Sequence, residues 1–306
     1  MNSRPPSLTG AQQGVLLALV SGVVWGLAPL YFRWVGAASP VEIVLHRVVW
    51  SVPLLALALT VTRRWPEVRR VVRDRRRLAT LALSAVLIAV NWFVFVYAVS
   101  TRQVVEASLG YFINPLFSAA LGVLVLRERP RPLGWCALAI AALGVGNELL
   151  QYGAPPWIAL TLAGSFGTYG LVRKQVGVAS DAGLFLELLV LLPCVLPALG
   201  WMVWSGQSHF GNVGALSVGL MLGSLVTVVP LMCFAGAALR LPLTTLSFFQ
   251  YLSPSISLAL AVGVFHEPLG SVRALTFGAI WLALFVSAVD VLRQHRRPAV
   301  ARLADA

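Results

Sequence analysis

The chain has 306 residues, of which 58% are hydrophobic and only 11% are charged. Its mean hydropathy is +0.84, whereas soluble domains carry about 25% charged residues. These numbers argue against a soluble enzyme and, in spite of a net charge of +12, against a nucleic-acid-binding domain. They predict a polytopic membrane protein in contact with the lipid bilayer.

Ten apolar segments follow one another along the chain, each close to the length of about 20 residues that crosses a bilayer. They are expected at 14–35, 40–62, 78–99, 104–126, 132–150, 155–174, 182–204, 214–238, 242–264 and 271–292. Pro40 opens the second segment, and Pro130 and Pro132 separate the fourth from the fifth, because proline cannot continue a helix unbroken. The sequence therefore predicts an all-α integral membrane fold with ten transmembrane helices.

The stretch from Glu106 to Arg129 returns in degenerate form from Thr245 to Pro268. A shift of 139 positions aligns Ser108 with Ser247, Phe112 with Tyr251, Pro115 with Pro254 and Glu128 with Glu267. The chain is thus expected to hold two five-helix repeats, at 14–150 and 155–292, between terminal tails at 1–13 and 293–306.

The basic residues predict the orientation, because positive charge near span ends is retained in the cytoplasm. Both termini inside would place 19 of the 23 basic residues on the cytoplasmic side. The eight arginines between Arg63 and Arg77 would then form a solvated cytoplasmic loop near anionic lipid. Since five is an odd number of crossings, the two repeats must have inverted topology, a construction that secondary transporters use.

The second apolar segment carries polar side chains inside the predicted membrane. Glu42, His46 and Trp50 share one helix face, and Ser39 with Glu42 has the spacing of a capping box. His46 is either a neutral side chain hydrogen-bonded within the bundle or a group that contacts substrate or protons. Arg47 would lie about 10 Å inside the helix, as a ligand for an anionic substrate group or as the partner of a carboxylate.

Glu187 is the best sequence candidate for that carboxylate, since a shift of 141 positions places it opposite His46 in the other repeat. An ionisable group inside a bilayer is disfavoured unless it faces a partner or water. We therefore expect Arg47 and Glu187 to pair across the interface of the two repeats, either at the transport site or as a purely structural ion pair.

Further polar and aromatic residues fall near the middle of predicted spans. Pro115 and Pro254 each remove a backbone donor, so both helices should break or bend there. Broken helices at mid-membrane are where transporter folds place their sites, although polar groups also join helices structurally and aromatic ones also anchor at the interface. The remaining substrate-binding or gating candidates are Asn91, Trp92, Tyr111, Asn114, Tyr169, Gln250 and Tyr251.

Several motifs together carry a resemblance that extends from about Gly14 to Asp290. They are QGVLLALVSGVVWGLAPLYF, EIVLHRVVWS, EASLGYFINP, YGLVRK and FFQYLSP. In these the chain resembles the RarD branch of the EamA-type transporters, within the drug/metabolite transporter superfamily. The resemblance implies a ten-helix inverted-repeat permease or exporter of small molecules in a bacterial inner membrane. The branch carries a name linked to chloramphenicol sensitivity, which does not fix a physiological substrate.

Taken together, the sequence favours a carrier of a small, partly apolar metabolite that works by alternating access without ATP. Protons are candidate coupling ions, through His46 or Glu187, and uncoupled transport is the alternative. An intramembrane enzyme that uses the same two residues as acid and base, or a channel, are the other classes. The histidines and cysteines lack metal-ligand spacing, so no cofactor or metal is expected. The sequence is compatible with a monomer and with a homodimer.

Overall fold

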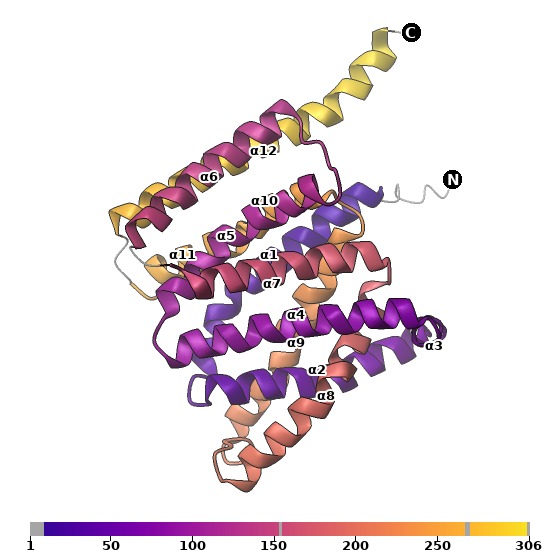
Figure 1. Ribbon diagram of the computed structural model, residues 1–306, viewed down its shortest axis with the longest axis vertical. Helices are drawn as coiled ribbons and strands as arrows, with labels where there is room; N and C mark the ends of the chain where they lie inside the picture. Colours follow the sequence, from indigo (N-terminus) through magenta and orange to yellow (C-terminus); the bar gives the residue numbers. More distant parts are fainter. Residues whose placement is uncertain (1–8, 153–154, 267–269, 305–306) are drawn as a thin grey trace, which may run out of the picture.

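The computed structural model of the protein describes residues 9–152, 155–266 and 270–304. Within these ranges every regular element is a helix (Figure 1). The helices are α1 (Gly10–Trp34), α2 (Pro40–Val61), α3 (Trp65–Arg73), α4 (Arg75–Ser100), α5 (Val104–Leu124), α6 (Pro132–Tyr152), α7 (Trp157–Val176), α8 (Ser180–Trp204), α9 (Gly214–Ala238), α10 (Leu243–Gln250), α11 (Leu252–Gly263) and α12 (Ser271–Ala304).

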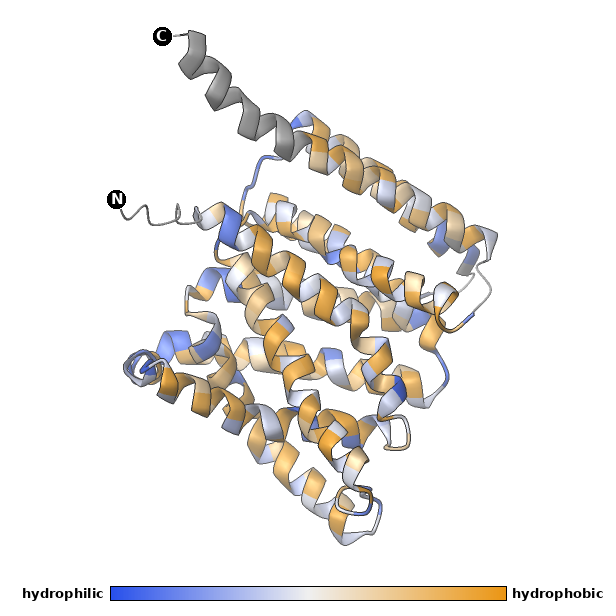
Figure 2. Cartoon of the chain, turned by 180° about the vertical axis from the view of Figure 1, so that it is seen from behind, coloured by the Kyte–Doolittle hydropathy of each residue, from blue (hydrophilic) through white to orange (hydrophobic). Residues whose placement is uncertain are grey.

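The all-α membrane fold predicted from the sequence is confirmed. In the described residues, eight helical stretches are long and apolar enough to cross a membrane, with α10 and α11 counted as one. The shorter, more polar α7 and the apolar part of α12, Ala274–Val289, account for the other two predicted spans. Figure 2 shows hydrophobic residues along the sides of the bundle and hydrophilic ones mostly at its two ends, as lipid contact requires.

Local sequence signals set several helix starts. Thr9 and Gln12 form a reciprocal capping box at the start of α1. Ser39 accepts a hydrogen bond from the backbone N–H of Glu42 at 3.1 Å, which is half of the box predicted there, while the Glu42 carboxylate binds elsewhere. The Asp74 side chain accepts from two backbone N–H groups in the first turn of α4, satisfying donors that have no partner within the helix.

The sequence predicted a loop for the arginine-rich segment between the second and third spans, but part of this segment is a helix. Residues Trp65–Arg73 form the amphipathic helix α3. Val68 and Val71 are buried, and the Trp65 ring meets that of Phe185 edge-on at 5.3 Å. Apolar residues at helical spacing therefore fix this segment to the bundle and leave its arginines on the surface.

The two prolines predicted to break helices have different effects. The predicted span at 242–264, which contains Pro254, is interrupted at Tyr251, between α10 and α11. The Gln250 carbonyl lies four residues before Pro254 and therefore loses its helical donor. A break at Pro115 is wrong, because α5 continues through it, whereas a bend there stays a prediction. The Tyr251 hydroxyl donates to the carbonyl of Phe112 at 3.2 Å, next to the carbonyl that Pro115 deprives of its donor, and neighbouring helices can support such a site.

The two halves of the chain pack in a reciprocal pattern. Helix α1 lies against α9 and α11, and α7, at the same place in the other half, lies against α4 and α5. Helices α2 and α8 pack on each other, and so do α6 and α12, which lie together along one edge of the bundle in Figure 1. These contacts are those expected of two five-helix repeats. The predicted division at 14–150 and 155–292 remains a prediction.

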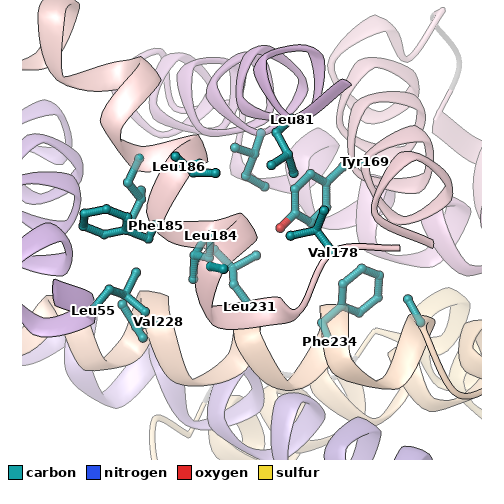
Figure 3. Close-up of a cluster of buried hydrophobic side chains, with 14 of the residues drawn as sticks. Leu55, Leu81, Tyr169, Val178, Leu184, Phe185, Leu186, Val228, Leu231 and Phe234 are labelled. Carbon is teal, nitrogen blue, oxygen red and sulfur yellow. The ribbon is translucent and has the colours of Figure 1, made fainter. Parts of the chain in front are cut away.

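The ends of the chain and one repeat position need separate comment. The predicted C-terminal tail at 293–306 is helical as far as Ala304, as a continuation of α12, and its place in the cytoplasm stays a prediction. Part of the predicted N-terminal tail, at 1–8, lies outside the described residues, as do Glu267 and Pro268 of the second repeat copy. The apolar core in Figure 3 draws on both halves, with Leu55 from α2, Leu81 from α4 and Phe234 from α9.

Candidate functional site

A cavity of about 420 Å³ lies between the two halves of the bundle. Its walls come from α1, α2, α4 and α5 of the first half and from α7 and α9 to α12 of the second. The wall is mainly apolar and aromatic, and includes Trp25, Phe32, Trp92, Phe95 and Phe166. Its volume is near the lower end of the range of about 300–1,000 Å³ typical of small-molecule sites.

Arg47 supplies the positive charge of this cavity. Its side chain is 9% exposed, and its Nε donates to the Thr227 hydroxyl of α9 at 2.7 Å. The guanidinium carbon lies 5.7 Å from the ring centres of both Phe32 and Trp92, within cation–π range. In the described part of the chain, no carboxylate lies within ion-pair distance of Arg47, and its terminal nitrogens have no acceptor.

Amides from three helices complete the polar part of the wall. Asn91 donates to the carbonyl of Leu162 at 2.9 Å and to the Ser165 hydroxyl at 3.1 Å, so it also ties α4 to α7. Asn114 donates to the side-chain oxygen of Gln250 at 2.6 Å, which joins α5 to the last residue of α10 beside the helix break. The Nε2 of Gln250 is buried without an acceptor among the described residues.

The cavity is directed toward one end of the bundle. Val104 at the start of α5 and Tyr111 line it at that end and are about half-exposed. Phe234 near the end of α9 and Leu246 near the start of α10 line it toward the other end and are buried. The lining is therefore more exposed at the first of these ends.

The other end of the bundle is held closed by polar contacts between the halves. The Glu128 carboxylate accepts hydrogen bonds from the backbone N–H groups of Leu243 and Thr244, at 2.7 and 2.8 Å, and from the Thr244 hydroxyl at 2.8 Å. It thereby caps the N-terminus of α10. The Lys174 ammonium lies 3.9 Å from the same carboxylate and donates to the carbonyls of Ala238 and Leu241.

The predicted pairing of Arg47 with Glu187 is wrong. Glu187 is fully buried and pairs with Arg173 of α7 at 3.4 Å. It also accepts hydrogen bonds from the hydroxyls of Ser84 at 2.5 Å and Tyr169 at 3.3 Å. Helices α7 and α8 are joined by a short connection, which keeps Arg173 within reach, whereas Arg47 faces the cavity. Tyr169 therefore belongs to this buried polar cluster, and Figure 3 shows its ring among the hydrophobic side chains of the core.

His46 also lies outside the cavity lining. Its Nδ1 accepts from the Trp50 indole N–H at 3.2 Å, as their shared helix face predicted, and its ring stacks on Phe210 at 4.7 Å. Nearby, the Glu42 carboxylate accepts from the Ser208 hydroxyl at 2.8 Å and contacts the His209 ring at 2.9 Å. This face of α2 therefore fixes the connection between α8 and α9.

Six of the ten predicted site residues line the cavity, together with the helix-break residue Pro254: Arg47, Asn91, Trp92, Tyr111, Asn114 and Gln250. His46, Tyr169, Glu187, Tyr251 and Pro115 are outside its lining. No group of three His, Cys, Asp or Glu side chains in the described ranges is placed to hold a metal ion.

Sequence reasoning missed two residues that organise these groups. Arg173 is one of the 19 basic residues that the charge pattern places on the cytoplasmic side, yet it is 1% exposed. The Gly183 that follows in α8 was a possible signal, because a side chain there would overlap the Arg173 guanidinium. Thr227, which orients Arg47, gives no such signal, since a threonine within an apolar helix usually bonds its own backbone.

Comparisons with known proteins agree with this architecture. The EamA-like transporter family matches residues 12–146. The chain is 45% identical to an uncharacterized transporter of Vibrio cholerae, over 94% of this chain and 96% of that one. It is 42% identical to Protein RarD of Escherichia coli over 94% and 97%, and 31% identical to the Chloramphenicol-sensitive protein RarD of Pseudomonas aeruginosa, again over 94% and 97%.

A solved structure titled only as the crystal structure of a protein has the same fold. It superimposes with a TM-score of 0.69, covering 90% of this chain and 97% of that one at 16% identity. That likeness concerns the fold alone. The names of the sequence relatives support a role in transport across a membrane.

Proposed function

We propose that this chain is a secondary transporter. The chain belongs to the EamA-like transporter family and has RarD proteins among its relatives. The transporter would lie in a bacterial inner membrane, and its substrate would be a small metabolite or drug-like molecule. The observation that carries this proposal is the cavity between the two halves, lined by both and directed toward one end of the bundle.

The position of the closed end supports alternating access. Glu128 and Lys174 of the first and second halves meet the start of α10 at the closed end. A rocking of one half against the other would break these contacts and close the opposite end around the substrate. The interruption at Tyr251 provides a joint in the wall that moves. No step in this cycle requires ATP.

Charge supports an assignment of the two ends. The arginines of α3 and of the first turn of α4 lie at the end where α10 begins, and positive charge is retained in the cytoplasm. With both termini cytoplasmic, the cavity in this conformation would open away from the cytoplasm. One chain provides every described wall of the cavity, so a monomer would suffice for transport, and a homodimer would hold two independent cavities.

Proton coupling is the less direct part of the proposal. Neither His46 nor Glu187 lines the cavity, so a proton bound at either residue would act through helix packing and not through contact with substrate. The same separation weakens the alternative of an intramembrane enzyme, since these two residues are not brought to one place as acid and base.

The test is uptake of a labelled bacterial metabolite extract into proteoliposomes, read by mass spectrometry with and without a pH gradient. We expect saturable uptake and counterflow of unmodified compounds, and a dependence on the gradient would add proton coupling. Chemically converted compounds would instead indicate an enzyme, and single-channel currents in planar bilayers a channel. Liposomes that contain the Gly26→Trp variant serve as the control. This variant should be inactive, because even a Cβ at Gly26 would approach that of Ile256 to 2.6 Å.

A further inference from the structure

Two side chains of the described cavity wall present nitrogen donors that have no acceptor. The terminal nitrogens of Arg47 have no acceptor in the described ranges, and the Nε2 of Gln250 is buried in the same condition. The other amides, Asn91 and Asn114, already donate to protein oxygens. A buried donor without a partner costs free energy, so a molecule that supplies acceptors would be stabilised here.

Two carboxylates could have compensated the charge of Arg47: Glu42, which is near it in the sequence, and Glu187, which repeat symmetry places opposite this region. Neither of them does so. Glu42 is occupied by Ser208 and His209, and Glu187 by Arg173. The described lining of the cavity contains no Asp or Glu. A charged guanidinium at this depth is expensive without a counter-charge, so a bound anion would lower the free energy of the cavity.

Aromatic rings surround the position that such an anion would occupy. The guanidinium carbon lies 5.7 Å from the ring centres of both Phe32 and Trp92. Trp25, Phe95 and Phe166 continue this surface around the cavity. Rings of this kind favour a flat apolar body by stacking or edge contacts. A second acidic group would meet no second cation among the described lining residues.

We infer that the cavity binds small organic monoanions that join one acidic group, such as a carboxylate, to a planar apolar body. This inference rests on the proposed function and names its substrate class. The acidic group lies on the terminal nitrogens of Arg47, which Thr227 holds in place. The body lies between the aromatic rings, and a hydroxyl or carbonyl of the substrate accepts from Gln250.

The experiment measures binding, and therefore does not depend on transport. Purified protein in nanodiscs of neutral lipid is titrated with (4-nitrophenyl)acetate and with its amide, which differ only in charge and one donor group. The nitro ring quenches tryptophan fluorescence, and Trp25 and Trp92 lie in the cavity wall. We expect saturable quenching, with the acid bound at least about tenfold more tightly, as hydrogen bonds to a charged group allow.

Two variants test the assigned atoms. Arg47→Gln should reduce the preference for the acid to about twofold or less, whereas Arg47→Lys should retain part of it. Gln250→Glu, which removes the amide donor and adds a negative charge to the cavity wall, should weaken both ligands and the acid more than the amide. Arg33→Gln is the matched control, because Arg33 is exposed, lies over Phe265 and does not line the cavity.

The outcomes separate this inference from the proposed function. Equal binding of acid and amide, no saturable binding of the acid, or a preference that persists in Arg47→Gln would overturn the anion site. If proteoliposomes take up neutral compounds without such a preference, transport stands and the substrate class is wrong. If the acid binds through Arg47 but no compound is transported, the anion site stands and the transport proposal fails.

Discussion

The buried ion pair of Arg173 and Glu187 should contribute to the stability of the fold and not to substrate binding. Its atoms lie 3.4 Å apart, with both side chains excluded from solvent. At an effective dielectric constant of about 20, two unit charges at that distance attract by about 5 kcal/mol. Removing one partner leaves the other charged and buried, which typically costs about 3–5 kcal/mol.

The perturbation is a double-mutant cycle with Glu187→Met, Arg173→Met and the double variant. Methionine fills the space of either side chain without charge. Each single variant should lose about 3–5 kcal/mol of the free energy of unfolding. The double variant should lose clearly less than the sum, because it leaves no unpaired charge, with a coupling of at least about 2 kcal/mol.

The assay is reversible unfolding in mixed micelles, with increasing sodium dodecyl sulfate and helicity followed by circular dichroism. Titration with (4-nitrophenyl)acetate, per mole of folded protein, should give wild-type affinity in all three variants, since neither residue lines the cavity. Two single variants that each cost less than about 1 kcal/mol and add in the double variant would refute the ion-pair reasoning.

Three further changes test other contacts by different measurements. Glu128→Gln should speed amide hydrogen exchange at the start of α10 by about tenfold, because the charge-assisted hydrogen bonds to Thr244 weaken; unchanged exchange there would remove Glu128 as a latch. Glu42→Gln should do the same for residues 208–210 without altering the affinity for the acid. Gly223→Ala should weaken acid binding several-fold without changing net charge, since the new Cβ would lie 2.3 Å from the Tyr31 hydroxyl and 2.9 Å from Arg47 Cγ; wild-type affinity would contradict this packing of Arg47 and Tyr31 against α9.

The sequence predicted the membrane-spanning helices well because each one needs about 20 apolar residues, whatever it packs against. Proline positions also marked real boundaries, as at Pro40 and Pro132. Pro115 shows the limit of that signal, since neighbouring groups can support a helix that has lost one hydrogen bond. The arginine-rich α3 was read as a loop, because its charges hide two buried valines at helical spacing.

The candidate site was harder to predict because repeat symmetry indicates equivalence and not contact. A shift of 141 positions placed Glu187 opposite the region of Arg47, but the carboxylate pairs within its own half, across the short connection between α7 and α8. Positive charge near a helix end indicates topology on average, and it could not show that Arg173 is buried. The orientation of each side chain toward a neighbour or toward the cavity follows only from packing in three dimensions.

Four charged side chains of the described bundle fall into two groups with different consequences for transport. Glu42, Glu128 and Glu187 each have partners that stabilise one arrangement of helices. Arg47 alone among the described cavity-lining residues carries a charge, and it has no counter-charge when the cavity is empty. In the proposed transport cycle, the empty carrier would have to close around this unpaired guanidinium to change its orientation.

That cost should make exchange faster than net transport. A bound monoanion neutralises Arg47 during reorientation, whereas the empty carrier carries the desolvation penalty alone. We expect a labelled aromatic acid to exchange across proteoliposomes loaded with the unlabelled acid at least about tenfold faster than it enters empty ones, since a barrier difference of about 1.4 kcal/mol gives that ratio. Arg47→Gln should abolish the difference, because no charge is then left unpaired in the empty state. Equal rates in loaded and empty vesicles of the wild type would mean that the guanidinium finds another partner when the cavity closes.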